Sequence, residues 1–184
     1  MRTQNGYVLL VPLHFESPLI DLHSFRHLNT QIDLLSLPSS TTTPPPSLLT
    51  STSAQGTGGS FKIDAHTSNH PLDLKVSSAP LSHVLDLTAR TANGALSVTL
   101  PRTYEGAFRI ATTNAQPVVS PREGVSDPAG RGRERRVGWG QAGSRNAFAG
   151  TVVWEGGQDA EDVAHGTGNV EAVTTNAGAQ LLID

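Results

Sequence analysis

The sequence predicts an all-β fold: a repetitive two-sheet domain of β-roll, solenoid-like or sandwich type, preceded by a disordered N-terminal tail. Two observations lead to this prediction. Apolar and small residues alternate along several short runs, as they do in half-buried strands. The runs also come in pairs, and each pair meets at an Asn that has a Thr two residues before it. Four copies of such a two-strand unit indicate a stacked β architecture.

The clearest copy is Leu87–Pro101, LTARTANGALSVTLP, in which two alternating runs flank Asn93-Gly94. An Asn-Gly pair accepts the positive φ angles of a tight turn at little steric cost, so the runs are expected to pair with each other. The expected pairs are Thr91 with Leu96, Ala89 with Val98 and Leu87 with Leu100, with all six side chains on one face.

The other copies are centred on Asn69, Asn114 and Asn176. We assign a structural turn role to these three residues and to Asn93 and Gly94, because Asn tolerates left-handed backbone geometry and bonds its own neighbouring backbone. On this interpretation Asn93→Asp is nearly silent. The functional alternative is a regularly spaced ladder of Asn side chains that binds a polymer along one edge.

The repetitive domain is expected to span residues 61–184 and to contain two irregular loops. Residues 121–145 are rich in Gly and Arg, and residues 156–168 form an acidic, Gly-rich segment. Between them, FAGTVVW alternates like a strand but lacks the Asn turn.

Residues 1–35 are expected to be poorly structured, with a short amphipathic helix suggested by Leu22, Phe25, Leu28, Ile32 and Leu35. Residues 36–60 are dominated by Ser, Thr, Pro and Gly, and this composition is typical of a disordered linker. The apolar run near residue 10 is broken by Pro12 and is followed by no small-residue cleavage site. The compartment therefore stays unassigned, although the lack of a convincing signal peptide favours the cytoplasm.

Composition excludes some chemistry. The chain has no Cys, which rules out disulfides, thiolate catalysis and Cys-ligated metal centres. Its net charge of -3 gives no reason to expect nucleic acid or an acidic membrane as the default partner.

No residue is assigned a catalytic, cofactor-binding or metal-binding role. His23 and His27 have a metal-compatible spacing but lack a third ligand. Gly138–Gly143 matches GxGxxG, yet neither a buried strand before it nor a helix after it is expected, and a dinucleotide site needs both. His66 and His70 flank a turn and are expected to face solvent.

Two groups of charged residues support alternative functions. Asp64, Asp73 and Asp86 alternate with the apolar set, so they could act as surface carboxylates of a carbohydrate-active enzyme or serve solubility alone. The Arg131–Arg136 segment could grip phosphate as a weak nucleic-acid binder, or it could be a solvated loop that protects a sheet edge.

A resemblance rests on four segments of the chain: SSAPLSHVLDLTARTANGALSVTLPRTYEGAF, RERRV, FAGTVVW and VEAVTTNAGAQLLI. Over about residues 54–184 the sequence resembles an uncharacterised domain of many fungal hypothetical proteins. That domain is similar to the bacterial putative-adhesin families built from short β repeats. The resemblance implies a two-sheet β-roll or solenoid-like fold and carries over no activity.

The function expected from these observations is that of a non-catalytic β module for binding, adhesion or scaffolding. Its ligand would be a protein or a polysaccharide, and no cofactor is expected. The enzyme and nucleic-acid alternatives remain open at this point.

Overall fold

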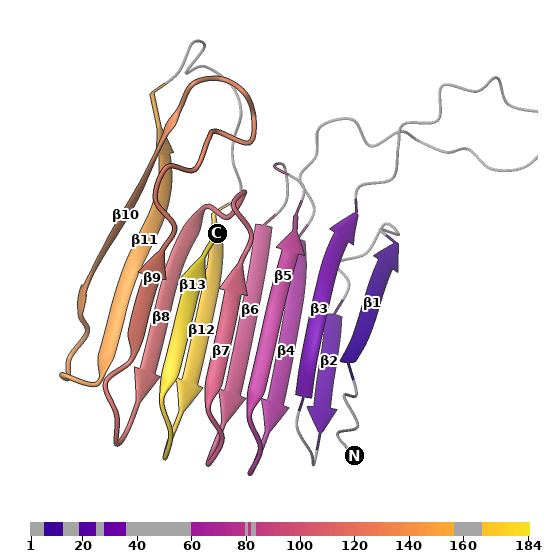
Figure 1. Ribbon diagram of the computed structural model, residues 1–184, viewed down its shortest axis with the longest axis vertical. Helices are drawn as coiled ribbons and strands as arrows, with labels where there is room; N and C mark the ends of the chain where they lie inside the picture. The colour runs from indigo at the N-terminus through magenta and orange to yellow at the C-terminus, as the bar shows by residue number, and fades with distance from the viewer. Residues whose placement is uncertain are drawn as a thin grey trace, which may run out of the picture.

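The protein is represented by a computed structural model, which describes residues 6–12, 19–24, 28–35, 60–79, 81, 84–156 and 167–184. Within these ranges every regular element is a strand, and the thirteen strands form two sheets (Figure 1). The predicted all-β, two-sheet class is therefore confirmed.

The first sheet has six strands, all parallel to their neighbours. In spatial order they are β1 (Gly6–Pro12), β3 (Leu28–Leu35), β5 (Leu72–Ser78), β7 (Leu96–Leu100), β13 (Ala179–Ile183) and β9 (Val118–Pro121).

The second sheet has seven strands and ends in an antiparallel hairpin. In spatial order they are β2 (Leu19–Ser24), β4 (Ser60–Thr67), β6 (Val84–Thr91), β12 (Gly168–Thr174), β8 (Gly106–Thr112), β11 (Ala147–Glu155) and β10 (Glu134–Gln141). The strands from β2 to β8 in this order are parallel, whereas β11 runs antiparallel to β8.

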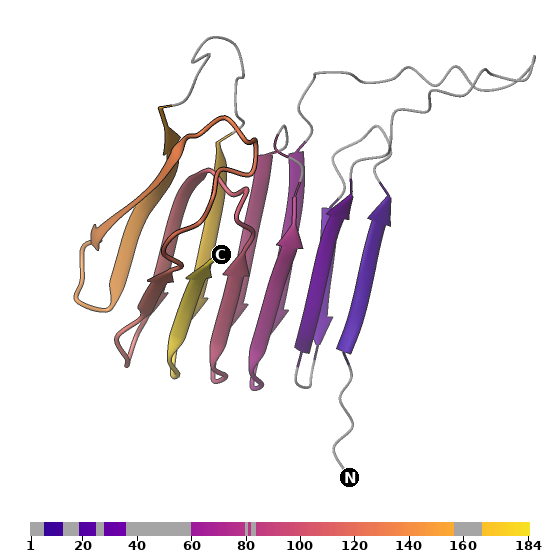
Figure 2. The same ribbon diagram turned by 45° about the horizontal axis from the view of Figure 1, so that its top comes forward.

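Strands joined by an Asn turn lie in different sheets. β6 pairs with β4 and β12, and β7 pairs with β5 and β13, so the two strands around Asn93 share no ladder. The expected hairpin pairs, Thr91 with Leu96 and so on, are therefore wrong. Each turn is an arc that carries the chain from one sheet to the other, and the arcs lie side by side at one end of the stack (Figure 2).

The prediction of a common face is confirmed nonetheless. All six alternating side chains of β6 and β7 are buried, with exposed fractions of 4% or less. Alternation sets which face of a strand is buried, but it does not reveal whether the strand bonds to its successor in the chain.

The core fills the space between the two sheets. Its members are aliphatic or aromatic residues that alternate along the strands, and buried threonines end the inward-facing rows. The largest fully buried side chains are Phe61, Phe108, Ile63, Leu72, Leu74, Leu87, Leu96, Leu100, Ile110 and Leu181.

The stack does not follow chain order. The unit β12–β13, which comes last in the sequence, lies between β6–β7 and β8–β9. The segment between β9 and β12 includes the β10–β11 hairpin, which extends the second sheet beyond β8.

The sequence had suggested that residues 121–145 form an irregular loop, but part of this segment is a strand. β10 occupies Glu134–Gln141 and pairs along its whole length with β11. Gly138 and Gly140, which weakened the strand signal, lie within this strand. The strand predicted from FAGTVVW is confirmed as part of β11, whereas residues 157–166 of the acidic segment lie outside the described residues.

The prediction of a short helix before residue 36 is wrong. β2 and β3 occupy this region and pair in parallel with β4 and β5. Short apolar segments fit either helical or strand spacing, and the deciding factor is the neighbouring strand edge, which local sequence does not show. Phe25, His27 and the linker residues 36–59 lie outside the described residues.

Candidate binding site at the arc end of the stack

Buried threonines form the inner layer of each arc. Thr67, Thr91, Thr112 and Thr174 have exposed fractions of 7% or less. Thr91 shows their role, because its hydroxyl donates to the His70 carbonyl at 3.2 Å and accepts from the Gly94 amide at 3.1 Å. The hydroxyls therefore satisfy backbone groups that the arcs would otherwise leave unpaired in the interior.

The four asparagines form the outer layer, which we call the asparagine row. Three of the amide nitrogens donate to the amide oxygen of a neighbour, from Asn93 to Asn69 at 2.6 Å, from Asn176 to Asn93 at 2.5 Å and from Asn114 to Asn176 at 2.9 Å. The side chains are exposed but are used within the protein. These bonds use the amide groups within the protein and leave fewer of them for a polymer ligand.

Gly94 is needed because the neighbouring arc approaches closely, and not because of a positive φ angle as the sequence suggested. Its φ angle lies outside the left-handed region, and a Cβ placed on it would lie 1.9 Å from the His70 carbonyl oxygen. Close approach of two neighbouring arcs, not positive φ, excludes a side chain at this position.

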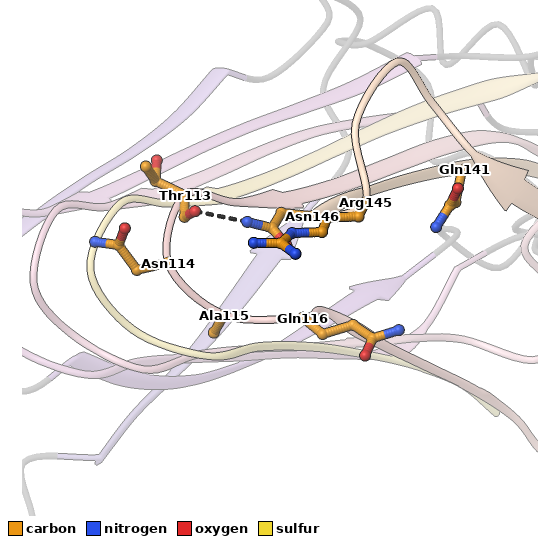
Figure 3. Close-up of a pocket in the computed structure, with 7 residues that line it drawn as sticks. All are labelled: Thr113, Asn114, Ala115, Gln116, Gln141, Arg145 and Asn146. Atoms are coloured by element: carbon orange, nitrogen blue, oxygen red, sulfur yellow. Dashed lines mark hydrogen bonds between the residues drawn. The ribbon is translucent and has the colours of Figure 1, made fainter.

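At the end of the asparagine row lies a solvent-open hollow of about 450 Å³, which we call the polar hollow (Figure 3). Its lining consists of Thr113, Asn114, Ala115, Gln116, Gln141, Arg145 and Asn146. The first four residues belong to the arc after β8, and the others come from β10 and from the turn before β11.

Two hydrogen bonds join the two sides of the polar hollow. The Asn146 side chain donates to the Thr113 carbonyl at 2.6 Å, and the Thr112 amide donates to the Asn146 carbonyl at 2.9 Å. Gln116, Gln141 and Arg145 are exposed, and their side chains form no hydrogen bond within the described parts of the chain. They remain available to a ligand.

An exposed tryptophan lies beside the polar hollow. Trp139 is 44% exposed and shares a face of β10 with Gln141, two residues further along the strand. This face continues the inward side of the second sheet, because Trp139 pairs with Gly150 and Gly150 pairs with the buried Phe108. Among the described strands, the first sheet ends at β9, and none of them extends it opposite the outermost strand β10.

The arginine segment is mostly engaged within the protein. Arg133 forms an ion pair of 3.1 Å with Asp127, with exposed fractions of 7% and 3% for the two side chains. The Arg133 and Arg135 guanidinium groups lie 5.7 and 5.9 Å from the ring centroid of the buried Trp154. Arg136 pairs with Glu155 at 3.0 Å. The solvated-loop interpretation therefore fails for Arg133 and Arg135.

Asp127 organises the segment before β10. Its carboxylate accepts from the backbone amides of Ala129, Arg131 and Arg133 at 2.8–3.2 Å. Desolvation raises the pKa of Asp127, but the hydrogen bonds from the Arg133 side chain and from these amides lower the pKa by a larger amount. The net result is a pKa well below the ordinary value, so this carboxylate stays charged at neutral pH.

The three aspartate candidates lie on two different sheets. Asp64 and Asp86 are diagonal neighbours on the adjacent strands β4 and β6 of the second sheet, whereas Asp73 lies on β5 of the first sheet. All three alternate with core residues and so point outward, on opposite sides of the molecule. Among the described residues no group of three or more His, Asp or Glu is arranged to hold a metal ion.

A second hollow, of about 330 Å³, lies at the other end of the first sheet. It is lined by Ser77, Arg102, Arg122, Gly124, Val125, Ser126 and Asp184. Because Asp184 adds negative charge to the lining, this hollow does not present a one-sided positive surface.

Sequence reasoning placed Asn114 correctly at an arc but missed the rest of the polar hollow. Gln116, Gln141, Arg145 and Asn146 follow no periodic pattern, and the register between β8, β11 and β10 brings them together. The one available signal was Trp139, a lone aromatic in a Gly-rich segment that had been considered only as a nucleotide motif.

These features define a class of protein: an all-β domain of two largely parallel sheets joined by Asn-containing arcs, with a polar site at one end of the stack. The chain belongs to the family described as a domain of unknown function, DUF7330, whose model matches residues 25–174. The match begins earlier than the resemblance had suggested and includes β3. No curated protein and no solved structure gives a significant match to the chain. The described residues contain no helix of the length and hydrophobicity that a membrane span requires.

Proposed function

We propose that this domain is a non-catalytic binding module, adhesion-like or scaffolding in character, whose contact surface is the polar hollow with its neighbouring tryptophan. One observation carries the proposal. Three long polar side chains, Gln116, Gln141 and Arg145, gather around one hollow and are left unused by the described parts of the protein. Side chains that make no stabilising contacts within the protein are suited to recognition when the backbone that carries them is rigid.

The arrangement gives little support to the catalytic alternative. A glycosidase of the usual type needs two carboxyl groups on either side of one bond, roughly 5–10 Å apart. Asp64 and Asp86 are diagonal neighbours on the outer face of β4 and β6, but neither lines the polar hollow, whose lining contains no carboxylate, and Asp73 lies on the opposite face of the molecule. The nucleic-acid alternative through Arg131–Arg136 gains little support, because Arg133 and Arg135 are engaged within the protein and only Arg131 and Arg136 are exposed.

The proposal is tested by separating binding from turnover. The full chain is incubated with a panel of polysaccharides and proteins, and retention on each immobilised material and release of reducing ends are both measured. We expect retention on at least one material with no release of reducing ends, and reduced retention for Arg145→Gln. Sugar release that Asp64→Asn or Asp86→Asn abolishes would instead establish an enzyme.

A further inference from the structure

We infer that the polar hollow, together with Trp139, is a binding site for a neutral polysaccharide chain. One sugar ring packs on the Trp139 indole, and its neighbour places hydroxyl groups among the amides of the hollow. This inference rests on the proposed binding function and names its ligand class.

The first step is the exposure of Trp139. Among large apolar side chains of the described residues it is one of three that are exposed, at 44%, whereas Trp154 on the same hairpin is 6% exposed. An indole left this open on an inward-facing row is an unfilled contact surface. The face of an indole suits the C–H groups of a sugar ring, which are apolar although the ring edges carry hydroxyls.

The second step is that the position of Trp139 is fixed by its neighbours. Gly150 pairs with Trp139, and a Cβ on Gly150 would lie 2.7 Å from the Trp139 Cβ and 2.6 Å from the Phe108 ring. The three residues are therefore packed without room for another methyl group at the base of the indole. Gly150 acts as a positioning residue, because any side chain there would displace the Cβ atom from which the indole extends.

The third step is the chemistry next to the indole. Gln141 is two residues from Trp139 on the same face, about 7 Å along the strand. Gln116 lines the opposite side of the polar hollow, and both side chains carry an acceptor and two donors. A sugar hydroxyl both donates and accepts, so paired amides match it better than charged groups of one sign.

The fourth step concerns size and charge. A volume of about 450 Å³ falls within the 300–1,000 Å³ of typical ligand sites, but this hollow is open and polar instead of closed and apolar. Such a lining suits a hydroxyl-rich chain that continues into solvent. The lining has one charged group, Arg145, and no carboxylate, so it offers neither a clamp for a polyanion nor an attraction for a polycation.

The experiment uses the intrinsic fluorescence of the full chain, which has only two tryptophans. Neutral hexasaccharides of β-1,3- and β-1,4-linked glucose are titrated, with polygalacturonate as an anionic comparison. We expect a neutral hexasaccharide to change the emission, and Trp139→Phe to remove most of that change because Trp154 is buried.

Affinities are measured in parallel by calorimetry. We expect Trp139→Ala to weaken binding at least tenfold and Gln141→Ala to weaken it several-fold, with Trp139→Tyr retaining most of the affinity because it keeps an aromatic face. The matched control is Val153→Ala, which truncates an exposed side chain on the other face of the same hairpin and should leave binding unchanged. Far-UV circular dichroism of each variant checks that the hairpin is intact.

Each outcome separates this inference from the proposed function. If a neutral polysaccharide binds equally well to wild type, Trp139→Ala and Gln141→Ala, the proposed binding function is retained but the proposed site is wrong. If wild type binds no neutral polysaccharide but binds a protein through Arg145, the ligand class is wrong and the module stands. Preferential binding of polygalacturonate, lost in Arg145→Gln, would also overturn the neutral assignment.

Discussion

Gly94→Ala should destabilise the protein by about 3 kcal/mol. The new methyl group would lie 1.9 Å from the His70 carbonyl oxygen, far inside van der Waals contact with a backbone atom that has little freedom to move. Forcing extra volume into a packed site costs about 1–3 kcal/mol. Moving the arc would also weaken the bonds that Thr91 makes with His70 and Gly94, at about 1 kcal/mol each.

Urea denaturation followed by the emission of the buried Trp154 measures this effect. With a slope of about 2 kcal/mol per molar urea, the midpoint should fall by about 1.5 M. Gly178→Ala is the matched control, because a Cβ on Gly178 meets no atom within 4 Å, and its midpoint should stay within about 0.25 M of the wild type. Equal midpoints for the two variants would refute the close approach of the arcs.

Three further predictions concern the rest of the fold. Val98→Asp should cost several kcal/mol, since Val98 is 0% exposed, whereas Ser97→Asp on the outer face should cost under about 1 kcal/mol; similar denaturation midpoints would contradict the face assignment. Asn93→Asp should lower stability by about 1–2 kcal/mol, because a carboxylate cannot donate to the Asn69 oxygen; an unchanged melting temperature would show that the asparagine row contributes nothing. Asp127→Asn should lower stability at pH 7, and the deficit should shrink as the pH falls below about 4, because the pKa of Asp127 is depressed in the folded state and its contribution is lost once the wild-type carboxyl is protonated; a deficit independent of pH would exclude this linkage.

The Asn93→Asp prediction reverses the expectation drawn from the sequence. A turn role alone requires only a residue that tolerates the arc backbone, and Asp meets that requirement as well as Asn. The row adds a directional demand, because Asn93 must donate to Asn69 and also accept from Asn176. This demand arises between residues 24 and 83 positions apart, so no local pattern could reveal it.

The sequence pattern predicts which residues are buried, but it does not predict which strands pair. The inward residues of β6 and β7 were identified because the period of two is a property of each strand by itself. Which strands bond to each other depends on the whole stack, and β12 inserts between β6 and β8 although it is encoded far beyond both. The inward pattern of β12 would fit beside several of its neighbours, so the sequence could not distinguish these orders.

The polar hollow is built from two parts of the chain that are each tied to the stack. On one side, the Thr113 amide donates to the Thr175 carbonyl at 3.3 Å, and Asn114 ends the asparagine row through its bond to Asn176. On the other side, Asn146 fastens the hairpin turn to the Thr113 carbonyl. In the proposed site, the asparagine row would therefore support recognition even though its amides are used internally, because it fixes the wall against which the ligand is proposed to bind. A site fixed in advance in this way loses little conformational entropy on binding, and exposed side chains such as Gln116 and Arg145 carry most of the remaining cost. Breaking the row at Asn176 should accordingly weaken ligand affinity without removing any group that touches the ligand.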